Sequence, residues 1–332
     1  MNVKRLVEYG LVAAALVGVG ALAWGEPVKV DPKIPAYDKT KDAVSGKIKS
    51  AGSDTMINLM DDWAKGFKKE YPNVEVEVEG KGTGTAMPAL IQGAAQFGPA
   101  SRPLKKAEID QFEDKFKYKP TQLPTSLDAL AVFVHKDNPI KSLSLQQVDA
   151  IFSKNRKGGG DKDIKTWGDL GLEGEWKEKP ISLYGRNSAS GTYAFFKEHV
   201  LLNGDYKDSV KEQPGSAGVV DAVATDKFAI GYSGIGYKTS DVRAVPLAKT
   251  AKSKAIEATA DNVYADEYPL ARYLYLTLNH KPNSELEPLR REFLKYVFSK
   301  DGQEIVIKQG YFPVTAAVRE KSLKSVGIDP KK

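Results

Sequence analysis

The chain has 332 residues, with 49 Lys and Arg, 43 Asp and Glu, three His and no Cys. This length predicts about two domains and is sufficient to bury a core without disulfides or a structural metal. The absence of Cys excludes a disulfide framework, a thiol nucleophile and an acyl anchor on an N-terminal Cys. The three His lie far apart, so we expect no metal site, and no motif calls for a cofactor. A formal charge of +6 without a run of basic residues gives little support to nucleic-acid binding.

The N-terminus has the pattern of an export signal. Lys4 and Arg5 precede an apolar stretch over 11–24. That stretch is shorter than the roughly 20 residues that a membrane span needs. We therefore expect residues 1–25 to be a signal peptide, with an uncleaved anchor as the alternative. Residues 26–45 are rich in Pro, Lys and Asp without apolar periodicity, which is typical of a linker.

Beyond this linker, stretches with helical and with strand periodicity alternate along the chain. Capping boxes mark two predicted helix starts, at Ser144 with Gln147 and at Ser284 with Glu287. The alternation predicts an α/β fold with at least one mostly parallel sheet. In chain order we expect helix 55–71, strand 74–78, helix 86–97, strand 129–134, helix 145–152, strand 181–184, helix 191–201, helix 219–224, strand 228–232, strand 270–278, a helix from 284 to 298 and a final helix ending near Gly310.

Four turns rich in Gly, Ser and Thr share one design, because each comes directly after a strand or before a helix. The first backbone N–H groups of a helix have no internal acceptor, and the helix dipole adds partial positive charge there. Glycine lets a ligand approach the backbone and hydroxyls add donors, so such a turn favours a phosphate, a sulfate or a carboxylate. A buried Arg adds a full charge and a fork that matches two anion oxygens. The four turns are 52–55, 80–85, 98–103 and 185–192.

Each turn also has a simpler interpretation. Ser, Thr and Asp before a helix are most often N-caps, and Asp54 in particular fits that role. Arg102 and Arg186, taken singly, are typical of surface ion pairs. The turn at 80–85 matches neither the dinucleotide fingerprint nor the Walker A phosphate loop. Anion binding is favoured because four donor-rich turns occur in one exported α/β chain.

The fourth turn carries the clearest motif. Residues 185–192 read Gly-Arg-Asn-Ser-Ala-Ser-Gly-Thr, an Arg followed by Ser-Gly-Thr. With this motif the chain, from about residue 48 to 315, resembles the phosphate-binding proteins of bacterial ABC transporters, within the two-lobed type II periplasmic binding proteins. The resemblance implies that Arg186 grips the anion. It also implies that Ser190, Gly191 and Thr192 donate from a hydroxyl and from the helix N-terminus.

The other three turns resemble the remaining ligand loops of that family. The first loop binds phosphate through a Thr or Ser side chain and backbone N–H groups. The second loop is usually Ser-Gly or Thr-Gly before a helix, and the third approaches the ligand from the same lobe. The residues of this chain that the resemblance places on the anion are Ser53, Asp54, Thr55, Thr83, Gly84, Thr85, Ser101, Arg102, Arg186, Ser188, Ser190, Gly191 and Thr192.

Two positions depart from the family pattern. Many members have an Asp in the third loop, which accepts the proton of hydrogen phosphate, whereas this loop reads Ala100-Ser101-Arg102. Asp54 could supply that acceptor if it is not an N-cap. Many members also have an Asp where this chain has Ser188. Without that Asp, the positive charge of Arg186 is expected to be neutralised less completely. Both changes predict a more positive pocket and leave selectivity for phosphate over sulfate open.

The family fold implies two α/β lobes joined by crossover strands. Each lobe is expected to hold a mixed, mostly parallel sheet flanked by helices. One lobe would comprise 46–128 and 247–332, and the other 129–246. An anion between these lobes would make its full set of contacts only in the closed form.

The resemblance implies a monomeric periplasmic protein that binds inorganic phosphate and hands it to an inner-membrane ABC permease, without being an enzyme. A binding protein for another oxyanion (sulfate, tungstate or a phosphate ester) is the nearest alternative. An exported hydrolase using Ser190 or Ser53 is a second alternative. Against it, neither Ser lies in Gly-x-Ser-x-Gly and no His is close in sequence. A phosphate sensor or adhesin with the same fold is the third.

Overall fold

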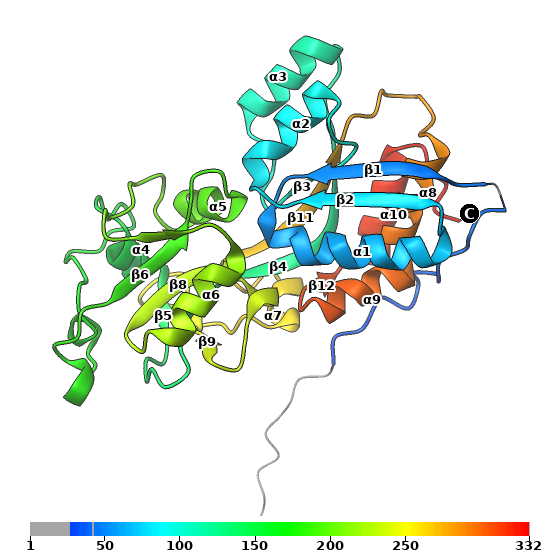
Figure 1. The fold of residues 1–332 in the computed structure, drawn as a ribbon. Coiled ribbons are helices and arrows are strands. Elements are labelled where there is room, and N and C mark those ends of the chain that lie inside the picture. Colours follow the sequence, from blue (N-terminus) through cyan, green and yellow to red (C-terminus); the bar gives the residue numbers. More distant parts are fainter. Residues whose placement is uncertain (1–26, 42, 332) are drawn as a thin grey trace, which may run out of the picture.

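The structure, a computed structural model, describes residues 27–41 and 43–331. The predicted signal peptide at 1–25 lies outside the described residues. The described chain forms two α/β halves connected by the long strands β4 (Thr121–His135) and β11 (Ala271–Leu278), as Figure 1 shows. None of the helices in this part of the chain is long and apolar enough to cross a membrane.

The elements alternate along the chain as expected for an α/β fold. The other strands are β1 (Gly46–Ala51), β2 (Val74–Glu79), β3 (Gly98–Ala100), β5 (Leu143–Ser144), β6 (Ser182–Arg186), β7 (Lys211–Gln213), β8 (Ala229–Gly234), β9 (Val242–Ala244), β10 (Leu247–Ala248) and β12 (Phe312–Pro313). The helices are α1 (Ile57–Glu70), α2 (Ala86–Gln92), α3 (Lys106–Phe116), α4 (Leu145–Phe152), α5 (Gly191–His199), α6 (Ser216–Thr225), α7 (Ala260–Tyr264), α8 (Pro288–Val297), α9 (Lys300–Lys308) and α10 (Ala316–Ser325).

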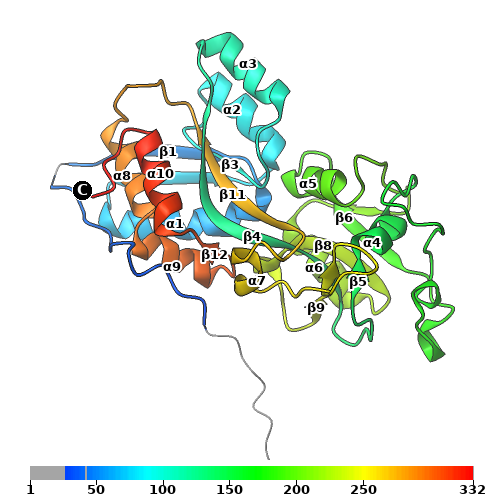
Figure 2. The ribbon, with the colours of Figure 1, turned by 180° about the vertical axis from the view of Figure 1, so that it is seen from behind.

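The largest sheet is mixed, and the two smaller sheets are parallel pairs of strands. β1 pairs with β2 in parallel, and β6 pairs in parallel with both β7 and β8. β4 and β11 add antiparallel ladders, because β4 pairs antiparallel with β11 in one half and with β8 in the other. Around β1 and β2, α1 lies on one side with α8 and α10 behind, as Figure 1 and the reverse view in Figure 2 show.

Each half has its own hydrophobic core. The first core contains Trp63 and Phe67 of α1, which pack with Phe293 of α8. These side chains recur at helical spacing on one face of α1, which is why this segment folds as an amphipathic helix. The second core is built around β4, where Ala129 to Val134 are fully buried, and includes Phe196 stacked on Tyr232.

Residues 247–270 pack with the second half. Leu247, Val263, Tyr268 and Leu270 belong to the core that 129–246 also builds. The Tyr268 hydroxyl donates to the Leu130 carbonyl at 3.0 Å. The chain therefore returns to the first half along β11, later than residue 247.

Part of the stretch expected to be a linker, residues 26–45, lies against the first half. Ile34 is 2% exposed, and the Tyr37 hydroxyl donates to Glu292 of α8 at 2.8 Å. The Lys300 amide donates to the Pro35 carbonyl at 2.7 Å. The linker expectation is therefore corrected for these residues. Their isolated apolar side chains fill positions on the lobe without forming a periodic pattern.

Three predicted elements end or begin elsewhere. The helix expected to reach Phe97 stops at Gln92, because Gly93 takes a left-handed conformation there (φ 71°). Ser284 does not cap a helix. Its hydroxyl donates to the Lys281 carbonyl, and α8 starts at Pro288, a residue suited to the first helical turn. Beyond Gly310, α10 follows as a helix that the periodicity did not reveal.

Candidate functional site

Three of the four turns form one surface of the first half. The Ser53 amide donates to the Pro99 carbonyl at 2.8 Å, and the Gly82 amide donates to the Gly52 carbonyl at 2.8 Å. The Ser101 amide donates to Thr83 Oγ1 at 3.1 Å. Backbone hydrogen bonds thus hold the loops at 52–55, 80–85 and 98–103 side by side, although they are far apart in sequence.

The fourth turn comes from the second half. It leaves β6 at Arg186 and enters α5 at Gly191. Ser190 is the N-cap, and its Oγ accepts hydrogen bonds from the amides of Thr192 (3.1 Å) and Tyr193 (3.3 Å). The capping interpretation therefore holds for this side chain. The Gly191 amide, at the first position of the helix, has no intrahelical acceptor and carries the positive end of the helix dipole.

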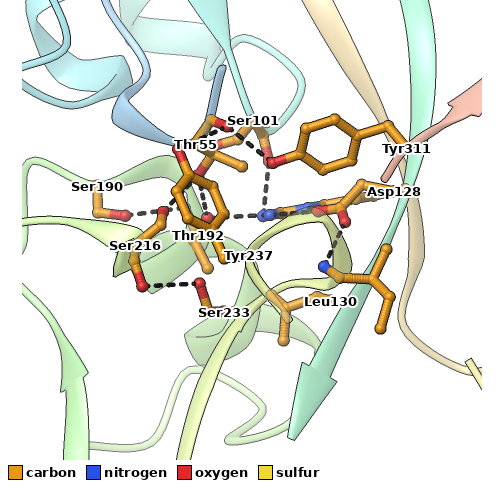
Figure 3. Close-up of polar contacts among 12 residues, drawn as sticks. Thr55, Ser101, Asp128, Leu130, Ser190, Thr192, Ser216, Ser233, Tyr237 and Tyr311 are labelled. Carbon is orange, nitrogen blue, oxygen red and sulfur yellow. Dashed lines mark hydrogen bonds and ion pairs between the residues drawn. The ribbon is translucent and has the colours of Figure 1, made fainter. Parts of the chain in front are cut away.

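The two halves meet where the first and fourth turns face each other. Thr55 Oγ1 lies 2.9 Å from Thr192 Oγ1 and 3.5 Å from Ser216 Oγ, which belongs to the start of α6. Figure 3 shows these three hydroxyls side by side. The Asp54 carboxylate crosses the same junction, where it accepts the Ser216 amide at 2.7 Å and pairs with Arg186 at 3.3 Å.

Asp54 is not an N-cap of its own helix. Ser53 occupies the N-cap position of the 3₁₀ turn Asp54–Met56, and Met56 precedes α1. The Asp54 carboxylate instead sits at the N-terminus of α6 in the opposite half. A carboxylate is stabilised there by the helix dipole and by the free amide.

Arg186 brings a nearly fully buried charge into the junction. Its side chain is 1% exposed. Burial lowers the pKa of the Arg186 guanidinium, an effect that the Asp54 carboxylate opposes. Its Nη1 donates to Ser216 Oγ at 2.6 Å. Nε has no hydrogen-bond partner among the described residues, and neither does the buried Oγ of Ser53. Such orphaned groups are costly unless a ligand oxygen satisfies them.

The second and third turns lie against Gly191. A Cβ added at Gly191 would come within 2.4 Å of Thr83 Oγ1 and 2.5 Å of Ser101 Oγ. Only glycine therefore permits this approach of α5 to the two hydroxyls. The other predicted groups of the second turn are engaged elsewhere, because the Gly84 amide donates to the Ala189 carbonyl at 3.0 Å and Thr85 Oγ1 to the Gly82 carbonyl at 2.9 Å.

Two predicted residues lie outside this junction. Arg102 forms a two-pronged ion pair with Glu108, with Nη1 and Nη2 at 2.8 and 2.7 Å from the two carboxylate oxygens. That pair fixes the start of α3. The charge of Arg102, which was predicted to face the anion, is paired with Glu108 instead. Ser188 is exposed at the tip of the fourth turn. These positions do not support the predicted role of Arg102 and Ser188 in anion binding.

The structure adds residues that sequence reasoning missed. Arg272 of β11 pairs with Asp128 of β4, and its Nη2 also donates to Thr192 Oγ1 at 3.0 Å. The hydroxyls of Tyr237 and Tyr311 donate to the Thr55 carbonyl at 3.3 and 2.8 Å. A charged residue inside each buried strand was the signal for Arg272 and Asp128.

Ser216 was missed as well. It follows Gly215 directly before a helix, so it has the same design as the four turns.

Charge at the junction is nearly balanced. Asp54 stands against Arg186, and Asp128 against Arg272 at 2.7 Å. The pairing of each arginine with a carboxylate does not support the expected more positive pocket. The partner of Arg186 comes from the other half of the molecule, and local sequence patterns did not indicate this pairing.

Two halves joined by crossover strands, with a buried polar junction between them, define a two-lobed ligand-binding protein. The PBP superfamily domain matches residues 38–301. The phosphate-binding protein PstS of Pseudomonas aeruginosa is 50% identical over 328 residues, which covers 99% of this chain and all of that protein. PstS of Staphylococcus haemolyticus is 31% identical, covering 78% of this chain and 79% of the relative.

A solved structure agrees with these relatives. A protein of Clostridium perfringens, described as a phosphate ABC transporter substrate-binding protein and solved with bound phosphate, superposes with a TM-score of 0.69 at 26% identity. The match covers 81% of this chain and all of that structure. The chain belongs to the PBP superfamily and, within it, to the PstS family of phosphate-binding proteins.

Proposed function

We propose that the chain binds inorganic phosphate between its two lobes and delivers it to an ABC permease. The observation that carries the proposal is the buried guanidinium of Arg186, whose Nε lacks a partner among the described residues at the meeting point of both lobes. An oxyanion would satisfy this donor together with the Ser53 hydroxyl. Membership of the PstS family supports phosphate as that oxyanion.

Each lobe contributes donors suited to a tetrahedral anion. Ser53 and Thr55 belong to the first loop, while Arg186 and Gly191 come from the second lobe, whose Thr192 hydroxyl lies 2.9 Å from Thr55 Oγ1. A buried dianion is costly unless its oxygens are saturated with donors. Since these donors come from both lobes, the anion favours the closed arrangement over the open one by the contacts that exist only there.

Asp54 gives the site a means of selecting phosphate over sulfate. A carboxylate can accept the proton of hydrogen phosphate, whereas fully ionised sulfate offers no proton and would meet only repulsion. Asp54 lies at the junction with one oxygen on Arg186 and Ser216. We propose that it serves as the proton acceptor that the third loop lacks.

The chain is a binding protein and not an enzyme, since its relatives are phosphate-binding proteins. Ser190, one of the two Ser residues considered as nucleophiles, fits that conclusion. Ser190 Oγ accepts two backbone amides as a helix cap. His199 bonds with the Phe195 carbonyl and lies at the other end of α5.

We further propose the organisation of the whole chain. One lobe comprises 46–128 and 271–332, and the other 129–270, with the return at β11 supported by the packing of 247–270 in the second core. An N-terminal signal over 1–25 would export the protein to the periplasm. There it would act as a monomer, with the inner-membrane permease as its partner.

Calorimetry on unfolded, ligand-stripped and refolded protein tests the proposal. We expect phosphate to bind at micromolar concentration or tighter, and sulfate, tungstate and a phosphate ester to compete poorly. Tight binding of one of those anions instead would favour the alternative oxyanion. Binding of none would refute an anion-binding role. A transport protein should stimulate the ATPase activity of a reconstituted permease when phosphate is bound. A sensor or adhesin should not.

A further inference from the structure

Arg272 and Asp128 form a buried ion pair where the chain crosses between the lobes. They are direct cross-strand partners in β11 and β4, and their side chains are 1% and 0% exposed. The Arg272 Nε and Nη2 atoms lie 2.9 and 2.7 Å from Asp128 Oδ2. The ladder of β4 with β11 ends at Ala129, and its ladder with β8 begins at Leu130. The pair therefore sits at the point where β4 changes lobes.

The remaining donors of Arg272 reach both lobes. Nη1 donates to the Ser101 carbonyl in the third loop at 3.0 Å, and Nη2 donates to Thr192 Oγ1 at the start of α5 at 3.0 Å. Asp128 holds the guanidinium in place, and its other oxygen accepts the Ile235 amide at 3.0 Å. Rotation of one lobe against the other must lengthen at least one of the two bonds.

Arg272 also determines how the hydroxyls are directed. Thr192 Oγ1 accepts from Arg272, so its proton is available to Thr55 Oγ1 at 2.9 Å. On the other side of Thr55, Ser216 Oγ accepts from Arg186 at 2.6 Å. Each neighbour of Thr55 thus accepts from an arginine and can donate its own proton to Thr55 Oγ1, an arrangement that directs the Thr55 proton to a ligand oxygen.

We propose that Arg272 is a positioning residue for the bound anion. It stabilises the closed arrangement by joining Ser101 to Thr192, and it directs the Thr192 hydroxyl toward Thr55 and the Thr55 hydroxyl toward the anion. Asp128, Ser101 and Thr192 engage four of its five N–H groups, so it acts on the anion through these partners. This inference depends on the proposed function, since it assumes that an oxyanion binds at the junction.

The test is stopped-flow measurement of phosphate association and dissociation on the stripped, refolded full chain. Arg272→Gln is expected to raise the dissociation rate roughly tenfold or more and to change the association rate less than about twofold. Because Arg272 acts through Thr192, the double variant with Thr192→Val should lose little more than Thr192→Val alone. Arg272→Lys keeps the charge opposite Asp128 without the fork, so an intermediate dissociation rate is expected.

Arg319→Gln is the matched control. Arg319 is buried and donates to the carbonyls of Phe298 and Pro330 within one lobe. The Arg319→Gln substitution should lower the melting temperature and leave the phosphate dissociation rate unchanged. Equal dissociation rates in wild type and folded Arg272 variants, or additive losses in the double variant, would overturn the inference. If Arg272→Gln does not fold, Arg272→Lys decides the outcome. Failure of the wild-type chain to bind phosphate would refute the proposed function itself.

Discussion

Arg186 Nη2 lies 3.3 Å from Asp54 Oδ2, and the two residues belong to opposite lobes. The same carboxylate oxygen accepts the Ser216 amide at 2.7 Å, so one acidic group of the first lobe holds both a charge and a helix terminus of the second. Buried ion pairs gain little net stability, because desolvation offsets their attraction. The pair is better understood as setting the geometry of the junction, so that closure and ligand contact depend on the same atoms.

Arg186→Ala should abolish most phosphate affinity. The substitution removes the only guanidinium of the fourth turn and leaves Asp54 with the Ser216 amide alone. Loss of a buried charge-assisted contact is expected to weaken binding by about 100-fold or more, at roughly 1.4 kcal/mol for each factor of ten. Calorimetry measures the effect, and circular dichroism checks the fold.

Arg102→Ala is the matched control for that variant. Arg102 is also buried and paired, but with Glu108 at the start of α3. The Arg102→Ala substitution should lower the melting temperature and leave phosphate affinity within about twofold of the wild type. The reason is that substitutions at distant sites without shared partners act independently. Equal losses of affinity in both variants would show that the fourth turn has no special role.

Asp54→Asn should narrow the preference for phosphate over sulfate. The amide keeps the shape of the side chain but replaces one acceptor oxygen by a donor. Hydrogen phosphate then loses the acceptor for its proton, while sulfate loses a repulsive neighbour. Competition of sulfate against labelled phosphate measures the ratio. An unchanged ratio would mean that another group accepts the proton.

Gly191→Ala should hold the lobes apart. The added methyl would meet Thr83 Oγ1 and Ser101 Oγ at 2.4 and 2.5 Å, too close for any Cβ. We expect weaker phosphate binding and a larger radius of gyration by small-angle scattering at saturating phosphate. Gly218→Ala is the control, since its Cβ would meet nothing closer than 3.5 Å within α6. A compact, tightly binding Gly191→Ala protein would contradict the closure geometry.

The Arg102–Glu108 pair should make stability depend on pH in the acid range. Burial raises the pKa of Glu108, but hydrogen bonds from Arg102 and from the Lys105 amide outweigh it, so the pKa lies below the usual 4.5. The ionised carboxylate therefore contributes stability in full above about 4.5, and this contribution is lost as the pH falls through the lower folded value.

Urea unfolding of wild type and Glu108→Gln between pH 7 and pH 3 checks this dependence. The wild type should be more stable than the variant at neutral pH, and the gap should close toward pH 3. A gap that stays constant over this range would show that the carboxylate does not titrate with folding.

Much of the fold could be predicted because it follows local rules. The apolar stripe of α1 and the run Ala129 to Val134 identify a helix and a buried strand through periodicity alone. α10 was missed because its apolar residues do not follow one face. Ser284 was misread because Pro288 determines where α8 starts.

The site was only partly predictable, because local patterns reveal single turns but not the contacts between distant segments. The four turns were found because Gly, Ser and Thr before a helix form a local signal. Arg272 and Asp128 showed only as single charged residues within apolar strands, and their pairing could not be predicted because it requires β4 and β11 to lie in register.

The sequence by itself determined the class of fold and the donor-rich turns, since periodicity and helix termini are properties of neighbouring residues. The tertiary structure alone decided which charges face one another. It paired Arg102 with Glu108 away from the junction, and it brought Asp54 to Arg186 across 132 residues of chain. The role of a charged side chain depends on the partner that folding brings close to it, and no local pattern reveals that partner.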